Sequence, residues 1–192
     1  MFAGNINPAQ CFDIVTKAAR IVIDRGYDKV HYIILGDGMS KKWLLEEVVR
    51  LGLKKYFSFE GLHPVTDIPK YQSVADALIV ALAKSPLFEY GIPAKVYSYM
   101  PSGKPLIASM DGEGKNLINN LSKCGICVDS GDVEGLANAI EKMVIMPKSE
   151  RLKLGENGYK YYKKHFDREY NLDRLEAFVF NETRIPDAEY PD

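Results

Sequence analysis

The sequence predicts an α/β fold, a doubly wound parallel six-stranded sheet of Rossmann type. Short apolar runs alternate with segments of helical periodicity through most of the chain. The run 77–82 is continuously apolar, as expected of a strand covered on both faces. A length of 192 residues suits one buried core rather than two. We therefore expect a single domain over residues 1–184 and a loosely ordered tail over 185–192.

Each element follows from its apolar pattern and its flanking turn residues. The expected strands, in chain order, span residues 2–3, 31–35, 56–59, 77–82, 105–108 and 126–128. The expected helices span residues 8–26, short segments after the caps Ser40 and Thr66, and then 93–100, 114–121, 133–144, 148–165 and 167–180.

Turn residues mark where these elements begin and end. Asn7 and Pro8 are typical of a helix start, because proline at the first helical position loses no hydrogen bond. Gly103 is the expected left-handed residue after the helix 93–100, and Pro105 prevents that helix from continuing. The chain opens almost inside its first strand, so we expect further residues ahead of it.

Charge and composition exclude several classes of function. Lys and Arg number 25 against 26 Asp and Glu, so the chain has no global field for nucleic acid or anionic lipid. The sequence contains no run of about 20 apolar residues, and its first residues do not resemble a signal peptide. We expect a cytoplasmic domain that is not itself inserted in a membrane.

The three cysteines are predicted to be structural. Cys124 and Cys127 have the Cys-x-x-Cys spacing of redox or zinc sites, but they run into an apolar strand and no second Cys or His pair accompanies them. Buried free cysteine is common in cores, and a reducing compartment fits this usage. The three histidines share no metal-ligand spacing either, so we expect no metal.

The loops at the carboxyl ends of the strands are the expected ligand site of such a sheet. Gly36, Asp37 and Gly38 follow the second strand, where glycines with positive φ bring backbone N–H groups to an anion. A Gly-Asp-Gly sequence between a strand and a helix is more often only a tight connection. His63, after the third strand, is the histidine best placed to reach a ligand, unless it is only a loop residue.

Two later loops carry further candidates. Gly91 and Pro93 start a helix with Lys95 close by, which suits a diphosphate, although Lys95 could equally be a solvated side chain. Asp111 and Glu113 follow the fifth strand in a Gly-rich loop. Their carboxylates either accept bonds from sugar hydroxyls or act as solvated charges at a helix start.

No Gly-x-Gly-x-x-Gly fingerprint, Walker loop, Gly-x-Ser-x-Gly or His-Glu-x-x-His occurs, so we expect neither NAD nor another cofactor. The ordered loops instead resemble the C-terminal domain of the group 1 family of retaining nucleotide-sugar glycosyltransferases, which have the GT-B fold. The similar segments are 4–10, 35–38, 59–61, 68–71, 75–76, 92–108, 112–113, 125, 131–132 and 155–158.

The resemblance implies that the segment 93–104 holds the diphosphate and ribose of a nucleotide-diphosphate-sugar donor, UDP-linked in type. It leaves the catalytic residues unassigned. The donor-binding residues that it implies, together with the loops above, are Gly36, Asp37, Gly38, His63, Glu89, Gly91, Ile92, Lys95, Ser98 and Glu113.

The chain departs from the family pattern in two places. Many members have a Glu-x7-Glu motif whose second Glu binds the ribose, and Ser98 stands at that position. Tyr90 stands at the first position, with Glu89 beside it. Many members also place Arg and Lys in the first loop, where this chain has the amide residues Asn5, Asn7 and Gln10. These departures resemble a subgroup that uses amino-sugar or deoxysugar donors for surface polysaccharides.

GT-B enzymes have a second, acceptor-binding domain that this chain does not match. The resemblance implies that the missing domain binds a saccharide or lipid-linked saccharide acceptor and holds the enzyme at the inner face of the membrane. The helix 167–180 would return towards that domain. The chain should then bind a donor but barely transfer it. Two alternatives remain open: a non-catalytic subunit that completes a split glycosyltransferase, and half of a nucleotide-sugar 2-epimerase.

Overall fold

The computed structural model describes residues 1–180, with the side chain of residue 87 left aside. The expected tail at 185–192 lies outside the described residues, as does the predicted end of the domain at 184. The strands are β1 (Phe2–Ala3), β2 (Tyr32–Leu35), β3 (Phe57–Gly61), β4 (Leu78–Ala81), β5 (Leu106–Ser109) and β6 (Gly125–Val128).

Helices follow nearly every strand. The α-helices are α1 (Phe12–Asp24), α2 (Lys41–Arg50), α3 (Ile68–Val74), α4 (Pro86–Glu89), α5 (Ala94–Tyr99), α6 (Gly112–Asn116), α7 (Val133–Ile145), α8 (Lys148–His165) and α9 (Arg168–Val179). Single turns of 3-10 helix are η1 (Pro8–Gln10), η2 (Lys54–Tyr56), η3 (Val65–Asp67) and η4 (Met100–Ser102), and η5 (Leu117–Leu121) is a π-helical turn.

The predicted single sheet of six strands is wrong in one respect, because the strands form two parallel three-stranded sheets, β1-β2-β3 and β4-β5-β6. The two sheets meet where the Met1 amino group donates to the Ala77 carbonyl and Ile79 N–H donates to the Met1 carbonyl, both over 2.9 Å. Two residues after Met1, the Tyr99 hydroxyl bonds both backbone groups of Ala3 and keeps β1 apart from β4. The strands still succeed one another in the doubly wound order β3-β2-β1-β4-β5-β6.

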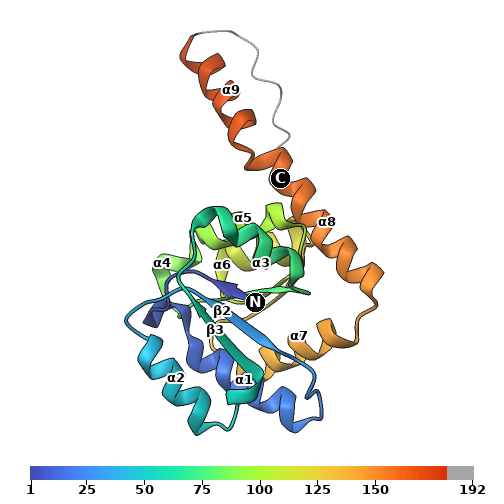
Figure 1. The fold of residues 1–192 in the computed structure, drawn as a ribbon. Helices are drawn as coiled ribbons and strands as arrows, with labels where there is room; N and C mark the ends of the chain where they lie inside the picture. Colours follow the sequence, from blue (N-terminus) through green and yellow to red (C-terminus); the bar gives the residue numbers. More distant parts are fainter. Residues whose placement is uncertain (181–192) are drawn as a thin grey trace.

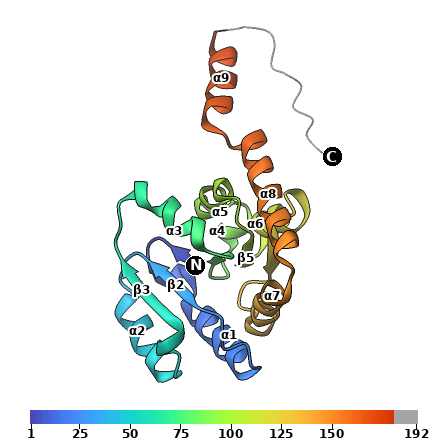
Figure 2. The ribbon, with the colours of Figure 1, turned by 45° about the vertical axis from the view of Figure 1, so that its right-hand side comes forward.

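Helices cover both faces of the strands, as the apolar runs predicted. On one side lie α1, α2 and α7, and on the other α3, α5 and α6 (Figures 1 and 2). Alternate residues of β4 serve the two cores: Ile79 belongs to the α1 and α7 side, while Leu78 and Val80 belong to the α5 side. All four β4 residues are buried, which explains why this strand is continuously apolar.

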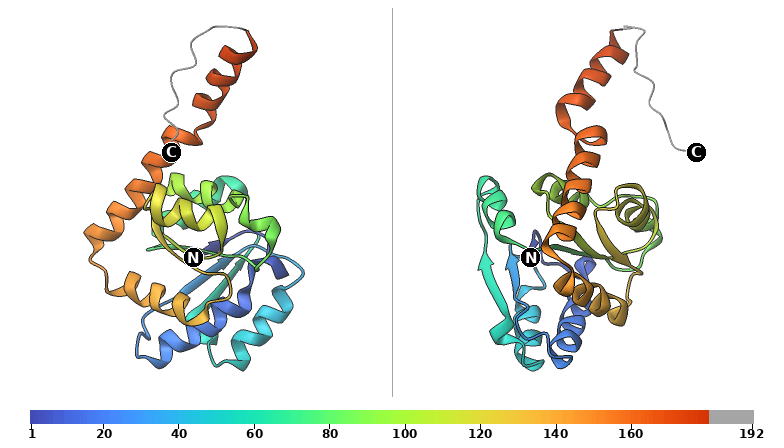
Figure 3. Two further views of the ribbon diagram at one scale, coloured as in Figure 1. Left: turned by 180° about the vertical axis from the view of Figure 1, so that it is seen from behind. Right: turned by 90° about the vertical axis from the view of Figure 1, so that its right-hand side faces the viewer.

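The long helix α8 packs against the body through two glycines. A Cβ on Gly155 would lie 1.9 Å from the Gly103 carbonyl oxygen, and one on Gly158 would lie 2.9 Å from Cβ of Cys124. Beyond this contact α8 and α9 project away from the sheet (Figure 3). Helix α9 buries none of its residues.

Several predicted element starts differ from the structure. Asn7 and Pro8 begin the single 3-10 turn η1 rather than a long helix, and α1 starts at Phe12 because Cys11 adopts φ 41° and redirects the chain. Ser40 flanks α2 without a capping side-chain bond. The short helix after Thr66 begins at Ile68, and the single turn α4 was not predicted. Gly103 has the expected left-handed conformation, with φ 65°.

The cysteines are free, and their surroundings are apolar. Burial raises the pKa of Cys124 to about 11 and that of Cys127 to about 12, so neither thiol forms a thiolate at neutral pH. Within residues 1–180, no three His, Cys, Asp or Glu side chains gather in an arrangement that suits a metal ion. None of the helices in the same range combines the length and apolarity needed to cross a bilayer.

The Gly155 contact generates a stability prediction. Gly155→Ala should lower the free energy of unfolding by about 1–3 kcal/mol, because the new methyl group overpacks the Gly103 backbone. In an open helix position the same change would stabilise by about 1 kcal/mol. Urea unfolding measures the difference. The control is Gly91→Ala, where nothing lies within 4 Å of the added atom; an equal loss in both variants would contradict the packing argument.

Candidate functional site

The loops after β1, β2 and β3 remain bonded to one another beyond the ends of their strands. Gly4 N–H donates to the Leu35 carbonyl over 3.0 Å, and Ile6 N–H donates to the Asp37 carbonyl over 2.8 Å. Gly36 N–H in turn donates to the Gly61 carbonyl over 2.7 Å. These bonds make the three loops one continuous wall at the carboxyl edge of the sheet.

The first two loops lie so close to each other that glycine is required at the contact. A Cβ on Gly36 would lie 1.9 Å from the Gly4 carbonyl oxygen, and one on Gly38 would lie 2.2 Å from that of Ile6. Their φ angles, +125° and +155°, also disfavour a side chain. Both glycines therefore serve the close packing of two loops, and only Gly36 reaches the pocket described next.

A pocket of about 580 Å³ opens between these loops and helices α3 and α5. Four of the residues predicted for the site line it: Gly36, Asp37, His63 and Ser98. The other lining residues are Ala3, Gly4, Asn5, Leu35, Leu62, Val65, Ile68, Pro69, Gln72 and Tyr99. The size falls within the range of small-molecule sites, which is about 300–1,000 Å³.

The carboxylate of Asp37 already has an ion-pair partner and a backbone hydrogen bond within its own loop. Its carboxylate accepts bonds from Lys41 Nζ and from the Gly38 N–H, each over 2.7 Å. The Lys41 bond, followed by the Gly38 bond, holds the pKa of Asp37 below its usual value. Asp37 therefore fixes its own loop and has limited capacity for a ligand.

His63 is held at the pocket by two neighbours. Its Nε2 lies 3.0 Å from the Tyr71 hydroxyl and 3.1 Å from the Glu60 carbonyl oxygen, and its ring contacts that of Tyr71 with centroids 4.6 Å apart. The ring is thus oriented by residues of β3 and α3. It presents an aromatic surface and one ionisable group to the pocket.

Lys95 is a half-buried cation beside the pocket. Its Nζ lies 3.7 Å from the centre of the Phe2 ring and fills the space above Gly4, 2.7 Å from where a Cβ would be. Burial lowers its pKa to about 8. None of the ion pairs within residues 1–180 involves Lys95. An ammonium whose only described partner is a ring is suited to attract an anion.

The N-terminus of α5, at Pro93, adds little to the positive potential of Lys95. Helix α5 has six residues, and its Val96 N–H already donates to the Pro93 carbonyl. A helix so short has few aligned peptide dipoles, so Lys95 supplies most of the positive potential. Ser98, one turn later, donates its hydroxyl proton to the Lys95 carbonyl over 2.9 Å. Its oxygen keeps acceptor capacity towards the pocket.

The other predicted residues lie outside the pocket, in a second group around α4 and α6. The backbone of Glu89 packs on Gly112, where an added Cβ would lie 2.0 Å from the Glu89 carbonyl oxygen. The Ile92 carbonyl accepts a bond from the Tyr97 hydroxyl. Glu113 is exposed in the first turn of α6, and Gly91 has open space around it.

Several residues of the site were not predicted. Gln72 is 6% exposed and lines the pocket from α3, and Tyr99 bonds the end of β1. The side-chain oxygens of Asn7 and Gln10 are buried without a hydrogen-bond partner in the described part of the chain. The amide-rich first loop was noticed in the sequence, but no sequence signal distinguishes Gln72 or Tyr99 from core residues.

Comparisons with known proteins agree with this arrangement. Residues 1–145 match a family model described as glycosyl transferases group 1. The lipopolysaccharide core biosynthesis glycosyltransferase LpsE of Rhizobium meliloti (strain 1021) is 26% identical over 140 residues, which are 73% of this chain and 38% of LpsE. The chain thus spans well under half the length of that relative.

Solved structures share the fold. Anabaena Alr3699/HepE in complex with UDP superposes with a TM-score of 0.78 at 19% identity, over 94% of this chain and 48% of HepE. The C-terminal domain of a glycosyl transferase group 1 family protein (LpcC) from Francisella tularensis superposes with a TM-score of 0.71 at 21% identity, over 87% of this chain and 85% of that domain.

The burial of Lys95 generates a prediction about stability and pH. Its pKa is about 8 in the folded chain and about 10.4 when unfolded, so the unfolded chain binds more protons between these values and stability rises with pH there. Below about pH 8 the cost of burial is complete. Lys95→Met should therefore stabilise the chain by about 1–3 kcal/mol at pH 7.

Urea unfolding at pH 7, 8.5 and 10 checks this, because the gain should shrink as the pH rises. Lys153→Met, at an exposed position of α8, is the control and should leave stability unchanged at each pH. A gain for Lys95→Met that is constant with pH would contradict the titration of Lys95.

Proposed function

The chain belongs to the glycosyl transferases group 1 family, and on this basis we propose that it binds the nucleotide-diphosphate-sugar donor as the C-terminal half of a retaining glycosyltransferase. The observation that carries the proposal is the half-buried Lys95, which has no ion-pair partner among residues 1–180, beside a pocket of nucleoside size. Such a cation is unfavourable in the empty domain and becomes favourable beside an anion.

The nucleoside occupies the pocket in this proposal. Leu62, Val65 and Ile68 supply apolar wall at its mouth, where the face of a base loses water. The Ser98 hydroxyl, on the opposite wall, accepts a bond from a ribose hydroxyl. Because serine carries no charge, this contact is weaker than that of a carboxylate at the same place.

The diphosphate lies at Gly4 and Lys95. Glycine lets the phosphates approach the backbone of the first loop, and Lys95 Nζ already lies above that residue. Binding the anion raises the pKa of Lys95 towards its ordinary value, since an opposite charge favours the protonated form. The same cation neutralises charge on the diphosphate as it leaves, which is the catalytic contribution that this half can make.

The sugar extends towards the second group of predicted residues. Glu89 and Glu113 stand at the end of α4 and the start of α6, and their carboxylates are suitable acceptors for sugar hydroxyls. The acceptor, a saccharide or lipid-linked saccharide, would bind to a second domain. That domain would also bring the enzyme to the membrane surface.

The relatives support UDP as the nucleotide and surface polysaccharide as the product. HepE was solved with UDP and with UDP-glucose, and LpsE is named for lipopolysaccharide core biosynthesis. A split-enzyme subunit and a 2-epimerase half would share this donor site. Release of UDP together with a new glycosidic bond, rather than an isomerised UDP-sugar, distinguishes the transferase from the epimerase.

Titration calorimetry with UDP and UDP-glucose tests the diphosphate assignment. Lys95→Met should weaken binding about tenfold to a hundredfold, because a hydrogen bond from a charged donor contributes about 1.5–3 kcal/mol. The matched control is again Lys153→Met, which should bind as the unchanged chain does. Equal affinity of the Lys95 variant and the control would refute a diphosphate at Lys95, and no binding to any nucleotide at millimolar concentration would refute the function.

Ser98→Ala tests the ribose contact in the same experiment. Loss of one neutral hydrogen bond should weaken UDP binding about twofold to tenfold. Ser73→Ala is the matched control, because the Ser73 hydroxyl makes the same bond to a carbonyl three residues earlier and does not line the pocket. If Ser98→Ala binds UDP as well as the Ser73 variant does, the ribose is held elsewhere.

A further inference from the structure

A buried glutamine on the inner wall of the pocket has no partner for its side-chain amide. The buried polar or charged residues of the described chain are Thr16, Glu47, Gln72, Ser109 and Ser122. The other four form side-chain hydrogen bonds, three of them to backbone carbonyls and Glu47 to a neighbouring Arg. The Gln72 amide forms none with residues 1–180. Since nearly all buried polar groups in proteins are bonded, this exception needs a physical reason.

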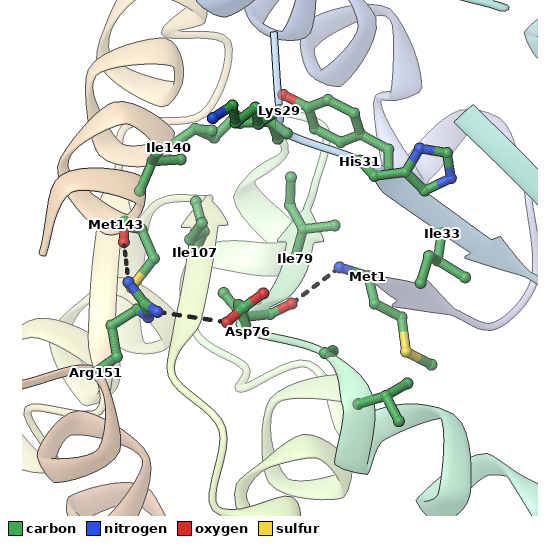
Figure 4. Close-up of a pocket in the computed structure, with 16 residues that line it drawn as sticks. Met1, Lys29, His31, Ile33, Asp76, Ile79, Ile107, Ile140, Met143 and Arg151 are labelled. Carbon is green, nitrogen blue, oxygen red and sulfur yellow. Dashed lines mark hydrogen bonds and ion pairs between the residues drawn. The ribbon is translucent and has the colours of Figure 1, made fainter. Parts of the chain in front are cut away.

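Arg151 shows the usual arrangement of a polar side chain at a cavity. It lines a second cavity, of about 350 Å³, where it donates to the Met143 carbonyl over 3.3 Å and lies 3.5 Å from the Asp76 carboxylate (Figure 4). Both of its terminal nitrogens therefore have partners within the chain. Gln72 is arranged differently, because it lines a larger pocket with its amide unbonded.

The Gln72 amide is open to the pocket. The side-chain atoms that are sealed from solvent without a partner belong to Asn7, Gln10 and Tyr32, and neither amide atom of Gln72 is among them. The residue as a whole is only 6% exposed, and it lines the pocket. An amide in this position has lost most of its water, so a bond from a ligand would recover what burial has cost.

Helix α3 places Gln72 next to the apolar wall of the pocket. Ile68 and Gln72 are four residues apart, so they lie on one face of α3. At the mouth, Leu62 and Val65 are 77% and 85% exposed, so Gln72 lies deeper than either. Ser98 belongs to α5, on the opposite wall. A flat ring that lies against Ile68 therefore points one edge at Gln72 and the other towards Ser98.

The amide matches one edge of uracil in chemistry. Its Oε1 is an acceptor, and its Nε2 beside it carries two donor hydrogens. Uracil has the N3–H donor next to the O4 acceptor, on the side of the ring away from N1, which carries the ribose. Two hydrogen bonds can therefore form side by side, as they do where glutamine binds other bases.

We propose that Gln72 is a specificity-determining residue that recognises the N3–H and O4 edge of the uracil of a UDP-sugar. The inference rests on the proposed function, because it requires the nucleoside in the pocket with its ribose at Ser98. Gln72 Oε1 accepts from N3–H, and Nε2 donates to O4. A base without this edge leaves the buried amide unbonded, and a site built in this way discriminates strongly against such an analogue.

Titration calorimetry with UDP and N3-methyl-UDP tests the assignment in the full chain, in Gln72→Met and in Ser73→Met. Methionine keeps the length of glutamine without its amide, and Ser73 is the exposed neighbour on α3, outside the pocket. The unchanged chain and the Ser73 control should prefer UDP to N3-methyl-UDP by about tenfold, because methylation removes the N3 donor. Gln72→Met should bind UDP about tenfold more weakly and lose this preference.

Inorganic pyrophosphate and Tm report on the fold of the variant. Gln72→Met should bind pyrophosphate as the unchanged chain does and should not lose Tm, since it removes an unbonded buried amide. Equal affinity of the unchanged chain for UDP and N3-methyl-UDP would overturn the assignment whatever the variant does. UDP binding by Gln72→Met as tight as that of Ser73→Met, or an undiminished preference for UDP, would overturn it too. If the unchanged chain binds no UDP, the proposed function itself is refuted, and the assignment of Gln72 fails with it.

Discussion

The close approach of the first two loops is the constraint on which the rest of the site depends. Gly36 lies against the Gly4 carbonyl and Gly38 against that of Ile6, at distances that no side chain tolerates. This contact lets the strands continue their pairing into the loops, so that the pocket has a wall of hydrogen-bonded backbone. It also leaves Gly4 bare, and Lys95 occupies the space above it. A rigid wall of this kind positions a ligand with little loss of entropy on binding.

The carboxyl end of β1 determines where the pocket opens. There Ala3 bonds to the Tyr99 hydroxyl instead of to β4, so the sheet divides and the pocket forms between the loops and α5. This opening lies at the junction of the two half-sheets, at the carboxyl ends of the strands, where ligands of doubly wound sheets commonly bind.

Under the proposed function, the cost of Lys95 to stability is the counterpart of its role in binding. The half-buried ammonium lies over the Phe2 ring, and partial loss of water lowers its pKa to about 8. A neutral side chain would pack there at lower cost, yet it would offer nothing to a diphosphate. Surface ion pairs such as Lys41 with Asp37 are different, because their charges are already matched and they mainly fix the local backbone.

The sequence by itself determined the alternation of strands and helices, since apolar periodicity reports directly on which faces are buried. It also identified the family, through loops whose order and spacing are specific. The helix start predicted at Asn7 was wrong, because propensity does not show that Cys11 turns the chain before α1 begins. The helix predicted after Thr66 starts one residue later than expected. Only the tertiary structure decided which candidates meet: Asp37, His63 and Ser98 share a pocket, while Glu89 and Glu113 lie apart from it. The reason is physical, since contacts such as that of Tyr99 with Ala3 join residues almost a hundred positions apart and depend on how the two half-sheets pack, which no local pattern encodes.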